Sequence, residues 1–291
     1  MIWTVTFNPS RDMTFVLDGR LEPGTIDVAT SVYARSGGKG NNVARVVRAL
    51  GDSVGAVGFY GGAIGDLVCR GLEEQGIVVL GEPVNGETRT CLTMVGRGGA
   101  EITEIREKGP PVRPPAADRL LRRLLERVTP GDWVTLSGSL PPELPPSVWA
   151  DWVRALNPRT RGVFVDTSGD NLRAANSANP LAMVPNRDEW NASGLSVTGS
   201  VIVTEGAEGA TWYPKPGVVR RLRPPRVAVN NTVGAGDAFL GGMVHGLNRG
   251  EGWEQALVWA VAVAAASVTS PGVADVDPVV ARSLISQVVL E

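Results

Sequence analysis

The chain has 291 residues, of which 43% are apolar and 20% are charged, and its formal net charge is −2. This balance is typical of a globular protein and argues against a nucleic-acid-binding protein, which usually carries a basic face. The N-terminal residues lack the basic and then apolar order of a signal peptide. The longest apolar run, 256–266, is shorter than the roughly 20 residues that span a bilayer. We therefore expect a cytoplasmic protein that binds neither nucleic acid nor a membrane.

The few cysteine and histidine residues exclude a zinc site. Cys69 and Cys91 lie in apolar segments with no metal-ligand spacing, and His245 is the only histidine. We interpret all three as structural residues.

Strands and helices alternate along most of the chain. This alternation predicts an α/β fold with a mostly parallel sheet, because strand–helix–strand units form such sheets. The expected order is strand 2–7, helix 40–50, strand 53–59, helix 66–75, strand 77–80, helix 116–128, strand 132–137, helix 147–156, strands 162–166, 181–184 and 201–204, and helices 235–248 and 253–268.

Two segments, 13–34 and 87–108, interrupt this alternation with strand pairs that have no helix between them. Gly98 and Gly99 lie between two apolar runs of the second segment, which predicts a hairpin tip there. We expect residues 1–291 to form a single domain, with these two segments making a small β-sheet lid beside a ligand crevice.

A glycine-rich turn lies near the C-terminus, at residues 230–240. Gly234, Ala235 and Gly236 precede an apolar helix, and Asp237 falls in its first turn. Free amides and the dipole at a helix start favour a phosphate, and an adjacent carboxylate can accept a proton from an attacking hydroxyl. The local pattern alone is equally consistent with an aspartate that only complements the helix dipole.

Two signatures in this chain resemble the pfkB, or ribokinase-like, carbohydrate kinases. The first is 231–237, Asn-Thr-Val-Gly-Ala-Gly-Asp, and the second is 36–45, Ser-Gly-Gly-Lys-Gly-Asn-Asn-Val-Ala-Arg. The resemblance implies a three-layer α/β/α fold with a β-sheet lid, ATP as phosphoryl donor and Mg²⁺ as cofactor. It also implies that Asp237 is the catalytic base and that the amides of Gly234, Ala235 and Gly236 stabilise the transferring group.

The second signature indicates where the sugar binds. Glycines at 37 and 38 allow a ligand to approach the backbone, and Lys39 supplies a positive charge. The resemblance implies that Gly37, Gly38, Lys39 and Asn42 contact the substrate. Asp12 follows the first strand, at the edge where open α/β sheets bind ligands, and is expected to accept hydrogen bonds from sugar hydroxyls.

Three segments resemble the branch of the family that contains 1-phosphofructokinase and tagatose-6-phosphate kinase. They are 6–12, Gly86-Glu87-Thr88-Arg89 and Ser137-Gly138-Ser139-Leu140-Pro141. An arginine fork matches phosphate oxygens, so Arg89 is expected to bind the phosphate already on the sugar. The resemblance also adds Ser137 and Ser139 to the substrate site.

The nucleotide side follows the family less closely. Asn186 and Glu189 resemble its NxxE element, which implies nucleotide binding by Asn186 and Mg²⁺ binding by Glu189, although the same residues could cap a helix. Thr204, Gly206 and Gly209 resemble the turn along the nucleotide. Val184 stands where relatives often have lysine, and 186–200 is short for a crossover, so we expect a trimmed helix there.

The expected reaction is phosphorylation of fructose 1-phosphate to fructose 1,6-bisphosphate by ATP. Tagatose 6-phosphate and fructose 6-phosphate are alternative substrates. A kinase of neutral sugars or nucleosides, and a non-catalytic sugar-phosphate sensor, are alternative functions. Relatives often pair through the lid, so a homodimer through this sheet is also expected.

Overall fold

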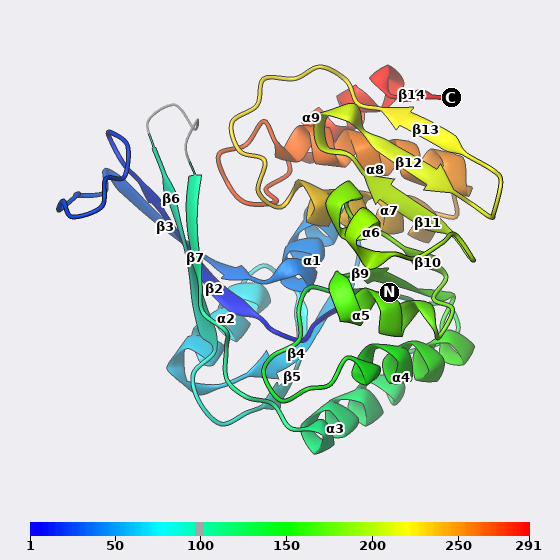
Figure 1. Ribbon diagram of the computed structural model, residues 1–291, viewed down its shortest axis with the longest axis horizontal. Helices are drawn as coiled ribbons and strands as arrows, with labels where there is room; N and C mark the ends of the chain where they lie inside the picture. The colour runs from blue at the N-terminus through cyan, green and yellow to red at the C-terminus, as the bar shows by residue number, and fades with distance from the viewer. Residues whose placement is uncertain (97–101) are drawn as a thin grey trace.

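The computed structural model describes residues 1–96 and 102–291, and its strands form two sheets (Figure 1). The larger sheet has the order β14-β13-β12-β11-β10-β9-β8-β1-β4-β5. Every neighbouring pair from β5 to β11 is parallel, and the pairs from β11 to β14 are antiparallel. Its strands are β1 (Ile2–Thr6), β4 (Val54–Tyr60), β5 (Val78–Pro83), β8 (Trp133–Ser137), β9 (Gly162–Asp166), β10 (Ala182–Met183), β11 (Val201–Thr204), β12 (Ala210–Tyr213), β13 (Arg220–Arg223) and β14 (Val289–Leu290).

Helices cover both faces of this sheet and make the three predicted layers. On one face α1, α2, α7 and α8 pack on Ile2, Val54 and Phe164, while on the other α3 and α4 pack on Trp3, Val5 and Phe7. Alternate β1 residues thus enter opposite cores, as the two-residue period of a strand requires. The helices are α1 (Lys39–Ala49), α2 (Gly62–Glu73), α3 (Pro114–Leu125), α4 (Ser147–Leu156), α5 (Gly169–Asn176), α6 (Arg187–Ser193), α7 (Ala235–Asn248), α8 (Trp253–Ser267) and α9 (Pro278–Leu284).

The α7–α8 pair positions the glycine-rich turn. A Cβ on Gly242 would lie 2.8 Å from Val263 Cβ, and one on Gly246 would lie 2.7 Å from Ala256 Cα, so these glycines allow the two helices to approach closely. The helix that begins at the glycine-rich turn is therefore packed tightly against α8.

The small sheet has four strands in the order β3-β2-β6-β7 and projects from one side of the molecule (Figure 1). Its strands are β2 (Ser10–Val16), β3 (Ser31–Gly37), β6 (Arg89–Val95) and β7 (Ile102–Arg106). The predicted strand pairs are confirmed, although the first begins and ends three residues outside 13–34. The predicted hairpin tip at Gly98 and Gly99 lies outside the described residues.

Several short elements were not predicted. They are α5, α9, β12 and the two-residue β14. The trimmed helix expected within 186–200 is α6, which has only seven residues. The basic segment Arg220–Arg223 forms β13, and β14 pairs with it on its outer side. No helix in the described part of the chain combines the length and the apolarity needed to cross a bilayer.

Candidate active site

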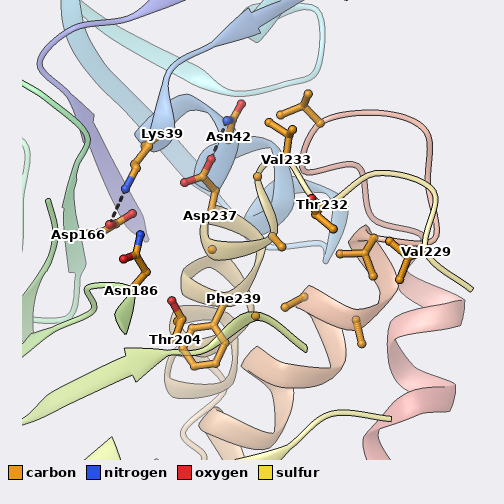
Figure 2. A pocket seen from close by; sticks show the side chains of 18 of the residues that line it. Lys39, Asn42, Asp166, Asn186, Thr204, Val229, Thr232, Val233, Asp237 and Phe239 are labelled. Carbon is orange, nitrogen blue, oxygen red and sulfur yellow. Dashed lines mark hydrogen bonds and ion pairs between the residues drawn. The ribbon is translucent and has the colours of Figure 1, made fainter. Parts of the chain in front are cut away.

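A cleft of about 850 Å³ opens between the small sheet and the carboxyl edge of the larger one. Asp166 ends β9 and Thr204 ends β11, so both reach the cleft from the same edge of the sheet. The first turns of α1 and α7 form the floor, with Lys39 and Asp237 directed into the space (Figure 2). This is the crevice outside the strand ends in which open α/β sheets bind ligands.

The glycine-rich turn makes a sharp entry into α7. Gly234 has φ of 83°, in the left-handed region, and a Cβ there would lie 2.8 Å from the Ala274 nitrogen. The Ala235 amide donates to the Thr232 carbonyl at 3.2 Å. The amides of Gly236 and Asp237 have no partner within α7 by helix geometry, and a Cβ on Gly236 would meet nothing within 4 Å. This turn therefore offers backbone donors to an anion in the cleft.

Asp237 is a buried carboxylate, 5% exposed, at the cleft floor. Its Oδ2 accepts a 2.7 Å hydrogen bond from Asn42 Nδ2 (Figure 2). Burial raises the pKa of Asp237 to about 7 and the Asp166 charge adds to the rise, whereas Lys39, Asn42 and Arg45 oppose it. A pKa near neutrality suits a group that takes up and releases a proton.

Lys39 lies between two carboxylates. Its Nζ donates to Asp166 Oδ1 at 2.9 Å (Figure 2). The same Nζ lies 3.7 Å from Glu189 Oε1. Burial favours the neutral amine, but the charges of Asp166, Glu189 and Asp237 outweigh it and hold the pKa of Lys39 above its usual range. Lys39 is therefore a cation at neutral pH.

Asp12 reaches the cleft from β2. Its Oδ1 accepts a 2.6 Å hydrogen bond from Ser10 Oγ, and burial raises the pKa of this carboxyl. A Cβ on Gly37, the residue across from Ser10 on β3, would collide with the Asp12 carboxyl group. Gly37 therefore leaves the space that Asp12 occupies.

Arg89 begins β6 and lines the cleft with its guanidinium fixed by backbone carbonyls. Nε and Nη2 donate to Asn8 O at 3.2 and 2.8 Å, and Nη1 donates to Glu107 O at 3.3 Å. The two predicted serines lie outside the cleft wall. Ser137 is fully buried, and its hydroxyl has no hydrogen-bond partner among the described residues, whereas Ser139 is exposed and accepts from Asn8 Nδ2 at 3.4 Å.

Asn186 and Glu189 form a capping box at the start of α6. Asn186 Oδ1 accepts from the Glu189 amide at 2.8 Å, and Glu189 Oε2 accepts from the Asn186 amide at 2.9 Å. The two residues therefore cap a helix, as the alternative interpretation expected. Both also line the cleft, and Glu189 Oε1 lies near Lys39. Thr204, Gly206 and Gly209 line the same side.

The sequence did not single out several residues of the cleft. Asp166 ends a correctly predicted strand, and the strand-end rule that identified Asp12 would also have identified it. Glu104 and Arg106 form an ion pair on β7, in a segment with no motif. An apolar wall beside the turn has no sequence signature either, because its residues come from separate segments: Val227, Val229, Val233, Phe239, Val261, Ala264 and Val268.

Comparisons with known proteins agree with this geometry. Residues 10–279 match the model of the pfkB family carbohydrate kinases. The 1-phosphofructokinase of Escherichia coli strain K12 is 32% identical over 292 aligned residues, covering 94% of this chain and 93% of the relative. Phosphofructokinase-2 of Escherichia coli superposes with a TM-score of 0.90 at 25% identity over 98% of both chains.

A more distant structure supports the fold. Ribokinase of Thermotoga maritima, 21% identical, superposes with a TM-score of 0.74 over 98% of this chain and 99% of its own length. This likeness confirms the predicted ribokinase-like architecture. With a family match over most of its length and a relative above 30% identity, the chain belongs to the pfkB family of carbohydrate kinases.

Proposed function

We propose that this kinase transfers the γ-phosphoryl group of ATP to the free primary hydroxyl of a phosphosugar, with fructose 1-phosphate as the preferred substrate. The observation that carries the proposal is the buried Asp237 carboxylate, which stands at the start of α7 and faces the same cleft as Lys39 and Arg89. The 32% identity with a 1-phosphofructokinase favours this substrate over others.

Asp237 accepts the proton of the attacking hydroxyl in this proposal. Asn42 occupies Asp237 Oδ2, which leaves Oδ1 for the substrate. The free amides of Gly236 and Asp237 then stabilise the charge on the transferring group, with Gly234 and Ala235 setting the turn. Ala235 contributes through its backbone position more than through its amide, since that amide already has an acceptor.

The sugar is held on the side of the small sheet. Asp12 accepts hydrogen bonds from its hydroxyls, supported by Gly37 and Gly38. Arg89 binds its phosphate with the N–H groups that its contacts with Asn8 and Glu107 do not use. The contacts of Lys39 with Asp166 and Glu189 favour a role at the transferring phosphoryl group rather than at the phosphate of the sugar. The small sheet acts as a lid that excludes water during transfer.

In this proposal the nucleotide lies along Asn186, Thr204, Gly206 and Gly209, which line the cleft. Its base lies against the apolar wall, next to Val229 and Phe239. The described residues contain no cluster of three or more metal-ligating side chains. Asp166 and Glu189 nevertheless fit Mg²⁺, which binds through one or two carboxylates plus phosphates and water. When bound there, Mg²⁺ would neutralise charge on the phosphates.

The test is turnover with Mg·ATP on fructose 1-phosphate, tagatose 6-phosphate, fructose 6-phosphate, fructose and ribose. We expect the highest kcat/KM on fructose 1-phosphate and a loss of about 10²–10⁴-fold or more in kcat for Asp237→Asn. Arg89→Ala should raise KM for the phosphosugar without changing KM for ATP.

Each alternative gives a different result in this assay. Preference for tagatose 6-phosphate or fructose 6-phosphate would show that the enzyme uses another phosphosugar with the same proposed mechanism. Activity on neutral sugars alone, insensitive to Arg89→Ala, would refute the phosphate contact. Absence of turnover with intact phosphosugar binding would indicate the sensor.

A further inference from the structure

Arg45 is a buried cation on α1, one turn after Asn42, with 7% of its surface exposed. Its two hydrogen bonds in the described part of the chain go to neutral oxygens: Nη2 donates to Asn42 Oδ1 at 2.7 Å and to the Val273 carbonyl at 3.0 Å. Its Nε has no partner there. Burying a guanidinium without full compensation is costly, so this side chain needs an explanation beyond packing.

The contact with Asn42 fixes which way the amide points. A guanidinium has only donors, so Arg45 can face only the Oδ1 end of the Asn42 amide. The Nδ2 end is then turned toward Asp237, whose Oδ2 it meets at 2.7 Å. A flipped amide would oppose two donors on one side and two acceptors on the other. Arg45 therefore selects the orientation in which the Asp237 carboxylate receives a donor.

The contact of Arg45 with Val273 affects the position of Asp237 through the backbone that supports its turn. Residues 270–276 pack against the glycine-rich turn, since the Ala274 amide donates to the Val233 carbonyl at 3.3 Å. A Cβ on Gly234 would lie 2.8 Å from that same Ala274 nitrogen. Arg45 thus ties α1 to a segment that supports the turn before Asp237, and so constrains the spacing between Asn42 and Asp237.

We propose that Arg45 is a positioning residue for phosphoryl transfer, and that it acts by holding the Asn42 amide nitrogen against Asp237. This inference rests on the proposed function only in taking Asp237 as the base. Without Arg45 the amide rotates and the carboxylate loses its fixed donor, while Asp12 and Arg89 still hold the sugar. The loss therefore falls on kcat more than on KM.

The test compares Arg45→Met, Asn42→Ala and the double variant. We expect Arg45→Met to lower kcat by about 10–100-fold, the range seen when a residue that orients a reacting group is lost, with KM for the phosphosugar within about threefold. If Arg45 acts through Asn42, the double variant should have the kcat of Asn42→Ala alone. The acid limb of the kcat/KM profile should also move to higher pH, since a cation near Asp237 is lost while Lys39 and Asp166 remain.

Arg48→Met is the matched control. Arg48 lies on the exposed side of the same helix, where Nε donates to the Gln75 carbonyl at 3.0 Å, so this variant should keep wild-type kinetics. If Arg45→Met does not fold, Arg45→Leu carries the same expectations, because leucine also lacks a donor for Asn42 Oδ1.

A crystal structure of the variant without substrate separates this inference from the proposed function. We expect Asn42 Nδ2 to lie beyond hydrogen-bond distance of Asp237 Oδ2 in it. Retention of that bond would overturn the inference whichever sugar the enzyme uses, as would wild-type kcat or a double variant whose loss is the product of the two single losses. Failure of the proposed function would instead appear as absent turnover by the wild-type enzyme.

Discussion

Because Asp237 is buried, the pH at which it loses its proton should control the rate of the reaction. Burial raises the pKa of this carboxyl to about 7, with Asp166 as the next cause and Lys39, Asn42 and Arg45 opposing it. The base works only when deprotonated, so kcat/KM should fall about tenfold for each pH unit below that value. The measurement is a kcat/KM profile from about pH 5 to about pH 9.

A phosphosugar also titrates in this range, near pH 6 by the behaviour of phosphate monoesters. The residual turnover of Asp237→Asn separates the two, because it should lack the limb that belongs to Asp237. A midpoint near the ordinary aspartate value in the wild-type enzyme would contradict the prediction.

The ionised, buried carboxylate of Asp237 should also lower the stability of the folded protein. Its pKa in the folded state is raised above the ordinary value of 3.8. From pH 3.8 to about 7 the carboxyl is therefore ionised in the unfolded state but still largely protonated in the folded state. Stability is therefore lost as pH rises through this window, and the penalty persists above it. We expect Asp237→Asn to unfold at a higher temperature than wild type at pH 8, with the difference vanishing toward pH 4. Equal melting temperatures at pH 8 would refute this.

The sequence identified those side chains of the cleft that belong to a recognisable motif. Asp237, Lys39 and Asp12 follow this rule, and all three line the cleft. Ser137 does not, because the direction of the side chain from the last residue of β8 decides whether it enters the cleft, and here it is fully buried. The apolar wall could not be predicted, since it depends on how α8 packs against 224–233.

The close approach of strand β3 to strand β2 determines the position of the Asp12 carboxyl group. A Cβ on Gly37 would collide with the Asp12 carboxyl group, so Gly37→Ala should displace that carboxylate. Loss of a hydrogen bond to a charged group costs about 1.5–3 kcal/mol, which corresponds to a loss of about 10–150-fold in kcat/KM for the phosphosugar. KM for ATP should change little, because Asp12 faces the sugar.

Steady-state kinetics with each substrate varied in turn checks this expectation. Gly19→Ala is the control, because a Cβ at Gly19 meets nothing within 4 Å and should leave both KM values unchanged. An unchanged KM and kcat/KM for the phosphosugar in Gly37→Ala would show that Asp12 does not hold the sugar.

Four elements in which more than half of the residues are buried were predicted with their boundaries, whereas α5 and β14 were not predicted. α4, α7, β9 and β11 begin and end where the sequence indicated. α5 has only Leu172 and Ala175 buried among its eight residues, too few to show a helical period. β14 has two residues and exists through its pairing with β13, which no local pattern can reveal.

For the whole molecule, the face of the small sheet turned away from the cleft predicts self-association. Asp12 and Arg106 line the cleft, so their strand neighbours lie on the opposite face. Paired residues of adjacent strands share a face, which gathers apolar side chains on this one: Met13, Phe15, Val32, Met94 and Ile105. Val32 and Ile105 are 50% and 56% exposed. An exposed apolar sheet face with open edges is a surface that a second copy can cover.

We therefore expect the wild-type chain to sediment as a dimer at micromolar concentration and Val32→Glu/Ile105→Glu to sediment as a monomer. Two carboxylates on the apolar face would have to be buried unpaired in the dimer, which costs more than the association returns. Val279→Glu is the control, because Val279 is 75% exposed on α9, outside the small sheet, and should leave the dimer intact. A wild-type monomer at every concentration, or a double variant that still dimerises, would place any pairing of the chain elsewhere than on this face.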